Sequence, residues 1–115
     1  MAKYMILMTD GGGAWDRLTP AQQEHVFRKH REFQSALERE GKLVSSGRLA
    51  PASEARTVLQ SPDGRTVVSD GPFAETKEVL GGYYVIEADS LAEAIEWAKR
   101  GRFIPGSNEV RPILE

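Results

Sequence analysis

The sequence predicts an α+β fold in which two β-α-β units flank a β-hairpin. Short apolar runs that end at glycine or proline alternate with two amphipathic segments that begin at capping residues. The length of 115 residues fits one domain, long enough to bury a core without disulfides or metal. With 40% apolar and 28% charged residues, the composition is that of a folded chain.

A strand and a long helix are predicted first. Residues 3–9 (Lys-Tyr-Met-Ile-Leu-Met-Thr) form a short apolar run that ends close to three glycines, which is typical of a strand. Residues 19–22 (Thr-Pro-Ala-Gln) supply a capping threonine, a proline for the first helical position and a glutamine that completes a capping box. We expect this helix to run to about Glu40, where Gly41 provides a left-handed cap.

One apolar stripe along this helix includes a histidine. The stripe is built from residues spaced by three or four positions, which lie on one face of a helix. His25 is expected at the solvent margin of that face. The members of the stripe are Val26, Phe27, His30, Phe33 and Leu37.

A second strand and a hairpin follow. Residues 42–49 alternate weakly and end before Pro51. Residues 56–60 and 65–69 are β-rich runs on either side of Ser-Pro-Asp-Gly, an order that suits a tight turn. The sequence therefore predicts a hairpin between the two β-α-β units.

The last third of the chain repeats the strand-helix-strand order. Residues 82–87 predict a strand, and residues 90–93 (Ser-Leu-Ala-Glu) form a second capping box. The helix should close at Gly101, and residues 109–113 should form a strand that Pro112 places at a sheet edge or at a strand terminus. The apolar positions expected to face the core are Leu91, Ala94, Ile95 and Ala98, with Trp97 off that stripe.

Two split β-α-β units joined in this way predict a ferredoxin-like sandwich with an inserted β-hairpin. Right-handed crossovers place both helices on the same face of the sheet. The opposite face should then be polar, yet apolar residues point both ways along two strands. Tyr4, Ile6, Met8, Tyr84 and Ile86 face one side, and Met5, Leu7, Tyr83 and Val85 face the other.

This second apolar face predicts a homodimer in which two sheets pack face to face. Leaving several large side chains in water would forgo several kcal/mol, at about 25 cal/mol per Å². The alternative is that the hairpin or the C-terminal tail folds over the open face.

Residues 70–84 (Asp-Gly-Pro-Phe-Ala-Glu-Thr-Lys-Glu-Val-Leu-Gly-Gly-Tyr-Tyr) are the most distinctive stretch. Here the sequence resembles the YCII-related proteins, in particular the subgroup named for its Asp-Gly-Pro-Phe (DGPF) tetrapeptide, and the likeness continues into residues 90–97 and 109–113. The resemblance implies a dimeric α/β-barrel of ferredoxin-like subunits. It also implies either a small-molecule or enzymatic role for a pocket, or an indirect link to extracytoplasmic-function sigma factors.

The motif has a structural and a functional interpretation. In the structural one, Asp70 completes an Asx-turn, Phe73 anchors the loop and the charged residues after it are solvated. In the functional one, Asp70 is the acid or base at the mouth of a dimer pocket, and Lys77 holds an anionic ligand. The ligand-binding residues predicted on this basis are Phe73, Lys77, Glu78 and Tyr84.

His30 also has two interpretations. A histidine on an apolar stripe is more often a core-edge residue with one satisfied nitrogen than a catalyst. The active interpretation pairs His30 with Asp70 across the sheet, as a general base oriented by a carboxylate. A His–Asp pair occurs in the wider YCII group, and neither His25 nor His30 aligns with it.

Composition excludes several functions. A net charge of −2 lacks the basic surplus that direct nucleic-acid binding requires, and the absence of cysteine excludes thiol chemistry. No residue spacing suggests a metal site or a cofactor motif. No apolar run is long enough for a membrane span, so a cytoplasmic location is expected. The function predicted is a small-molecule-binding dimer or enzyme; the alternative is an accessory protein that acts through protein contacts.

Overall fold

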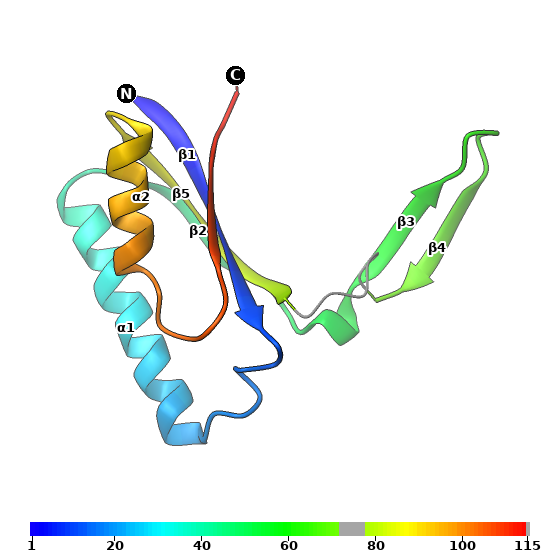
Figure 1. The fold of residues 1–115 in the computed structure, drawn as a ribbon, viewed down its shortest axis with the longest axis horizontal. Helices are drawn as coiled ribbons and strands as arrows, with labels where there is room; N and C mark the ends of the chain where they lie inside the picture. The colour runs from blue at the N-terminus through cyan, green and yellow to red at the C-terminus, as the bar shows by residue number, and fades with distance from the viewer. Residues whose placement is uncertain (72–77, 115) are drawn as a thin grey trace.

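A computed structural model describes residues 1–71 and 78–114, and it contains a helix-covered sheet and a separate hairpin (Figure 1). The secondary structure agrees with the predicted order, although the first and penultimate sheet strands are longer than expected. Its elements are β1 (Ala2–Gly11), α1 (Pro20–Arg39), β2 (Leu43–Arg48), a short 3-10 turn (Ala52–Glu54), β3 (Arg56–Gln60), β4 (Thr66–Asp70), β5 (Glu78–Ala88), α2 (Leu91–Arg100) and β6 (Asn108–Pro112).

The main sheet has the strand order β2-β5-β1-β6, and every neighbouring pair is antiparallel. Because α1 follows β1 and α2 follows β5, each helix connects two strands that are separated by one strand of the other unit. This is the order that two split β-α-β units produce. The mixed α+β prediction is confirmed, and β6 with Pro112 lies at a sheet edge as expected.

The first helix begins and ends where its capping residues predict. The Thr19 side chain accepts a hydrogen bond from the Gln22 N–H, while the Gln22 side chain accepts one from the Thr19 N–H. At the other end Gly41 has φ of +69°, the left-handed conformation that glycine adopts without strain. The helix is therefore fixed in register at both ends.

Both helices pack on the same face of the sheet. The core cluster joins side chains of both helices to those of β1 and β5, and its most enclosed members are Ile6, Leu37 and Ile86, each fully buried. The stripe predicted for α1 is confirmed, with His30 at its half-buried margin. The face predicted to pack against the helices comprises Tyr4, Ile6, Met8, Tyr84 and Ile86, and it does so here.

The face predicted for α2 was wrong in part. Trp97 is buried, with its ring 6.1 Å from that of Phe33, whereas Leu91 and Ile95 are 45% and 39% exposed. The reason is that α2 turns Ala94, Trp97 and Ala98 toward the core. Leu91 and Ile95 lie at the side of this face, so a stripe that includes them leaves out Trp97.

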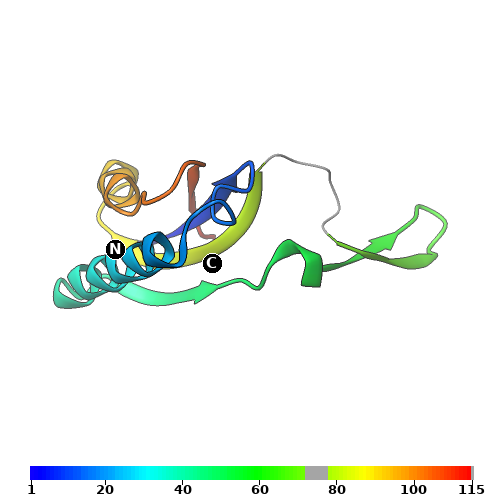
Figure 2. The same ribbon diagram turned by 90° about the horizontal axis from the view of Figure 1, so that it is seen from below.

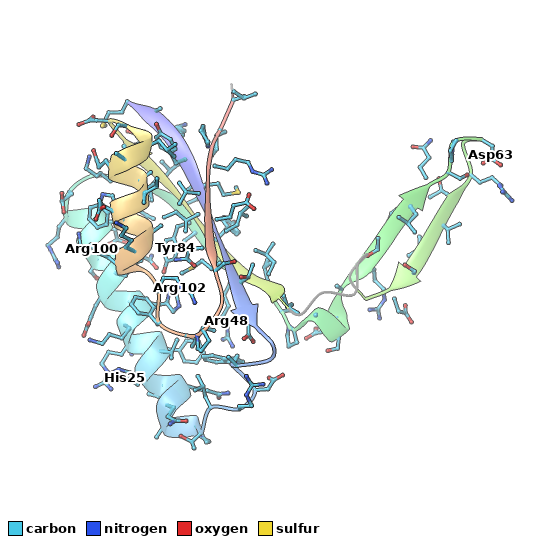
Figure 3. The ribbon with its side chains drawn as sticks, in the orientation of Figure 1. His25, Arg48, Asp63, Tyr84, Arg100 and Arg102 are labelled. Carbon is cyan, nitrogen blue, oxygen red and sulfur yellow. The ribbon has the colours of Figure 1, made fainter. Side chains whose placement is uncertain are left out.

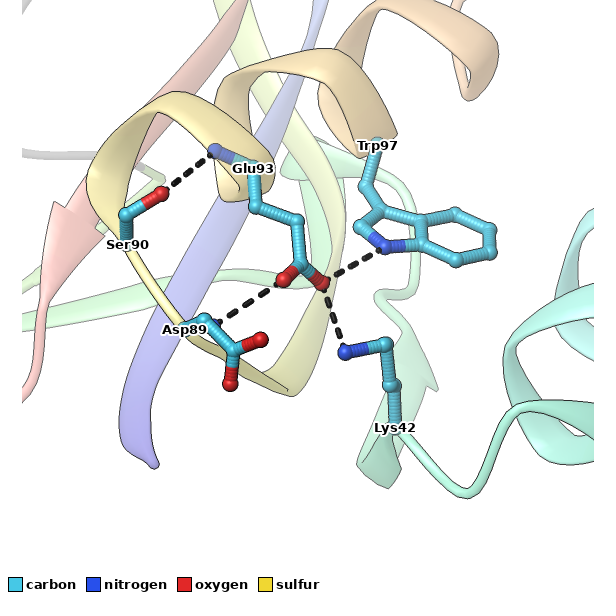
Figure 4. A network of polar contacts seen from close by, with 5 residues as sticks. All are labelled: Lys42, Asp89, Ser90, Glu93 and Trp97. Atoms are coloured by element: carbon cyan, nitrogen blue, oxygen red, sulfur yellow. Dashed lines mark hydrogen bonds and ion pairs between the residues drawn. The ribbon is translucent and has the colours of Figure 1, made fainter.

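A polar network ties α2 to the residue before β2 (Figure 4). Lys42 Nζ lies 2.7 Å from Glu93 Oε2, and the Trp97 indole N–H donates to the same oxygen at 3.3 Å. The hydrogen bond from Lys42 lowers the pKa of Glu93, and the same contact raises the pKa of Lys42. Ser90 caps the helix by accepting from the Glu93 N–H, so Glu93 serves both the cap and the ion pair.

The second sheet face is not covered by either helix. The hairpin of β3 and β4 projects away from the main sheet instead of folding over that face (Figure 2). The chain beyond β6 continues along β1, where the Ile113 N–H donates to the Lys3 carbonyl. Among the described residues on this second face, Met5, Leu7 and Tyr83 are half-buried, and Val85 is 9% exposed.

Candidate functional site

A polar pair at the margin of the core joins α1 to β5. His30 Nδ1 lies 3.1 Å from the Tyr84 hydroxyl, and the two rings are stacked at 6.2 Å with an interplanar angle of 12°. The Phe103 ring meets His30 edge-on at 4.7 Å. The imidazole is therefore held between a strand, a helix and the loop after α2, with one nitrogen occupied by a hydroxyl.

Burial shifts both members of this pair toward their neutral forms. Desolvation lowers the pKa of His30 from its ordinary 6.5 and raises the pKa of Tyr84 to about 12. At neutral pH the imidazole is uncharged and the phenol keeps its proton. A neutral imidazole can accept a proton from a bound molecule. The Tyr84 hydroxyl oxygen can then stabilise the protonated imidazole by accepting a hydrogen bond from it.

Aromatic and cationic side chains gather at the end of β2, near the start of α1. The Arg48 guanidinium lies over the Phe27 ring at 4.5 Å and the Trp15 ring at 5.5 Å. In the sheet, Ser46 pairs with Tyr84 and Arg48 pairs with Gly82. Because side chains alternate along a strand, the Arg48 side chain lies on the same sheet face as that of Tyr84 (Figure 3). The permanent positive charge of Arg48 thus lies on the helix-covered face, on the strand next to β5, which carries Tyr84.

A second arginine lies in the loop that carries Phe103. Arg102 donates from Nη1 to Asn108 Oδ1 at 3.3 Å, and its Nη2 bonds to the Ile104 carbonyl. These bonds brace the loop after α2, in which Figure 3 labels Arg102. They leave Arg48, whose contacts are with ring faces, as the cation better placed to receive an anionic group.

Asp70 is brought into a different part of the molecule. It ends β4 as predicted, and its carboxylate lies 3.2 Å from Arg56 Nε with a side chain that is 92% exposed. His30 contacts β5 and the loop after α2 in the main body, so a single chain does not bring His30 and Asp70 together. Phe73, Lys77 and the Glu78 side chain lie outside the described residues.

Two shallow surface hollows lie elsewhere. One, of about 340 Å³, is on the outer surface of α1, and the other, of about 390 Å³, surrounds the Lys42–Glu93 ion pair. Neither takes a wall from His30 or Asp70. Their linings are Arg28, Arg31, Glu32, Ser35 and Arg39 for the first, and Glu40, Lys42, Glu93, Glu96, Trp97 and Arg100 for the second.

Metal and membrane functions gain no support from the described part of the chain. Among residues 1–71 and 78–114, no three side chains of the types that ligate metals gather at one point. Across the same residues neither α1 nor α2 has the length and apolar content needed to cross a membrane.

Sequence reasoning singled out His30 and Tyr84 separately and did not pair them. Both were on the core-facing side of their elements, and that alternation was the available signal. Sequence reasoning missed Phe103 as a contact of His30, because the loop after α2 has no periodicity to predict its direction. It also missed the contact of the Arg48 guanidinium with the ring faces of Trp15 and Phe27.

The depressed pKa of His30 predicts a pH dependence of stability. Below pH 6.5 the unfolded chain binds the His30 proton more readily than the folded chain. The free energy of unfolding should therefore be at its full value above pH 6.5 and fall as the pH drops through the folded pKa. Urea unfolding at pH 7.5, 6.5 and 5.5 measures this effect.

Two histidine variants isolate that contribution. His30→Gln should flatten the stability change between pH 7.5 and 5.5. His25→Gln, which alters an exposed histidine on the same helix, should retain the wild-type slope. Equal slopes in His30→Gln and the wild type would show that the His30 proton is not linked to folding.

Comparisons with known proteins agree with one another. The family model of the YCII-related domain matches residues 2–115. An uncharacterised protein of Rhizobium meliloti (strain 1021) is 41% identical over 113 residues, which cover 96% of this chain and 90% of that protein. The match spans both β-α-β units and the hairpin between them.

Proposed function

Because the chain belongs to the YCII-related domain family, we propose that it is a homodimer that binds a small anionic molecule and uses His30 as an acid or base. The single observation that supports this most strongly is the His30–Tyr84 contact, a neutral imidazole held at 3.1 Å from a phenol that stays protonated. Arg48 supplies the charge that would attract the anion.

His30 is a better candidate for proton transfer than Asp70. An acid or base in a site needs a defined neighbour and shelter from water. His30 has both, whereas the Asp70 carboxylate is almost fully exposed and faces Arg56. In this proposal the Asp-Gly-Pro-Phe motif joins the hairpin to β5, and Asp70 serves the hairpin through its ion pair.

The dimer follows from the open sheet face. Met5, Leu7 and Tyr83 lie half-buried on the face opposite the helices, and Val85, which is 9% exposed, lies beside them on the same apolar face. A second copy placed there would bury these side chains by a two-fold arrangement of two sheets, the dimeric α/β-barrel. Sedimentation at micromolar concentration should show a dimer, and a monomer at every concentration would refute this part of the proposal.

Binding can be tested through the histidine itself. We would titrate a set of small carboxylic acids and phosphate esters into the protein and follow the imidazole resonances by NMR. At least one compound should shift the His30 signals, and His30→Gln should weaken its binding by at least about tenfold. His25→Gln should bind as the wild type does. No shift with any compound, or equal loss in both variants, would contradict the proposal.

A second candidate function is that of an accessory protein, with an indirect link to sigma-factor-controlled transcription and no direct contact with DNA. The observation that favours it is the row of exposed valines on the hairpin, since apolar surface of this kind marks protein contacts. A tagged chain recovered from its own cells with a stoichiometric transcription regulator would support this role. Recovery of the chain alone would argue against it.

A further inference from the structure

We propose that the β3–β4 hairpin is a dimer arm that packs against the body of a second copy of this chain. The inference deepens the dimer of the proposed function, on which it rests, and it assigns the hairpin a partner. It begins from the apolar residues that the hairpin carries. Val58 pairs with Val68, and Leu59 pairs with Val67.

Both faces of the hairpin are apolar and uncovered. Val58 and Val68 are 66% and 63% exposed on one face, while Leu59 and Val67 are 37% and 56% exposed on the other. Neither strand contributes to the core cluster formed by the described residues. An isolated two-stranded hairpin is marginally stable in water, so an arm of this composition needs a surface to pack against.

The chain has a larger radius of gyration and a larger accessible surface than a compact monomer of its size. A compact domain of 115 residues should have a radius of gyration of about 13 Å, and this chain has 16.0 Å. Its accessible surface is 7791 Å², against about 6,200 Å² expected for a folded monomer of 12.7 kDa. The excess belongs to a thin, elongated molecule of 48 × 40 × 18 Å from which the hairpin projects.

The open sheet face is too small to hold a dimer by itself. The four strands have 10, 6, 11 and 5 residues. At a spacing of about 4.8 Å and a mean length of about eight residues, they present a face of roughly 19 by 27 Å, or on the order of 500 Å². A stable interface buries about 800 Å² on each partner. In this proposal the hairpin provides the missing area, because it extends beyond the end of the sheet (Figure 2).

A second copy is the occupant that these observations favour. In a two-fold dimer the sheet face and the arm belong to one continuous interface, and each arm contacts the other subunit. The ion pairs at both ends of the arm, Arg56 with Asp70 and Arg65 with Asp63, are satisfied within the hairpin. The arm therefore offers an apolar centre with no unpaired charge at these ends, which suits burial better than recognition of a charged partner.

The test compares the sheet face with the arm. In sedimentation equilibrium, Val58→Lys with Val68→Lys should raise the dimer dissociation constant by at least about tenfold. The matched control, Ser35→Lys with Ala92→Lys, adds the same charge to exposed helix positions and should leave it unchanged. Thermal unfolding monitored by circular dichroism should confirm that the body is folded in both double variants.

A third variant distinguishes a failure of the proposed arm contact from a failure of the proposed dimer. Leu7→Lys should yield a monomer if the sheet face is the interface. A dimer that weakens in Leu7→Lys and keeps its wild-type affinity in Val58→Lys/Val68→Lys would overturn the arm and leave the proposed dimer standing. A wild-type chain that is monomeric throughout would refute the dimer itself.

A spin label gives a second measurement that does not depend on affinity. The chain has no cysteine, so Thr66→Cys places one label on the arm and Ala92→Cys places a control label on the outer surface of α2. The arm label should be immobilised in the dimer and become mobile in Leu7→Lys, while the control label should be mobile in both. An arm label that is mobile in the wild-type dimer would overturn the proposal.

Discussion

Replacement of Gly106 by alanine is expected to cost about 3 kcal/mol or more of unfolding free energy. Gly106 has φ of +145°, and a Cβ placed there would lie 2.1 Å from the Thr9 carbonyl oxygen and 2.9 Å from the Gly11 nitrogen. These are backbone atoms of β1 and cannot rotate away. Urea unfolding followed by circular dichroism measures the loss.

The clash would break the pairing between the end of β1 and the loop after α2. Thr9 N–H donates to the Ser107 carbonyl at 2.8 Å, and Gly11 N–H donates to the Pro105 carbonyl at 2.9 Å. The same loop carries Phe103 onto His30, so the variant should also move the pKa of His30 back toward its ordinary value. An NMR titration of the imidazole detects this second effect.

Gly12→Ala is the matched control. Gly12 has φ of +61°, and a Cβ there would meet no atom within 4 Å. Its cost should be limited to the left-handed conformation, about 1–2 kcal/mol. If both variants lose the same free energy, the contact between β1 and the loop after α2 contributes little, and its role in holding Phe103 would have to be abandoned.

Leu37→Ala is expected to cost about 2–5 kcal/mol, against a total stability of roughly 5–15 kcal/mol for a domain. Leu37 is fully buried within the cluster that joins both helices to the sheet. Alanine is an excellent helix former, so the loss would come from the cavity and the removed methyl groups rather than from the helix. Chemical denaturation at pH 7.5 provides the measurement.

Leu91→Ala on α2 makes the same chemical change at a side chain that is 45% exposed. It should cost less than about 1 kcal/mol. A Leu37→Ala variant as stable as Leu91→Ala would mean that the core closes over the cavity. The assignment of the cluster as the main source of stability would then be wrong.

Local signals accounted for most of the fold. The capping box at Thr19 and the left-handed Gly41 fixed the ends of α1, and the turn at residues 61–64 placed the hairpin, with Gly64 at φ of +88°. Alternation in β1 and β5 correctly identified which side chains meet the helices. These features depend on residues a few positions apart, and a single sequence displays them directly.

The errors involve packing between distant segments. The sequence places Trp97 off the core face of α2, yet its ring packs edge-on near Phe33, with the ring centroids 6.1 Å apart. Gly101 packs against the same Phe33 ring, since a Cβ there would lie 3.0 Å from it. The pairing of His30 with Asp70 was one of two interpretations of His30, and choosing between them needed the direction of the hairpin relative to the sheet. No periodicity encodes that direction, and in the single chain the hairpin leaves the body. The relation of Phe73 and Lys77 to the site stays a prediction.

The strand order has a consequence for synthesis on the ribosome. β1 is paired with β5 on one side and β6 on the other, and β2 is paired with β5. Among the described residues 1–71, none gives the apolar β1 a partner strand in this sheet, so β1 must wait for residues 78–88 to emerge. At about 5–20 residues per second the delay is roughly 3–13 s. During that interval the nascent chain exposes an apolar strand that has no pairing partner, and α1 is the nearest helix that can cover it.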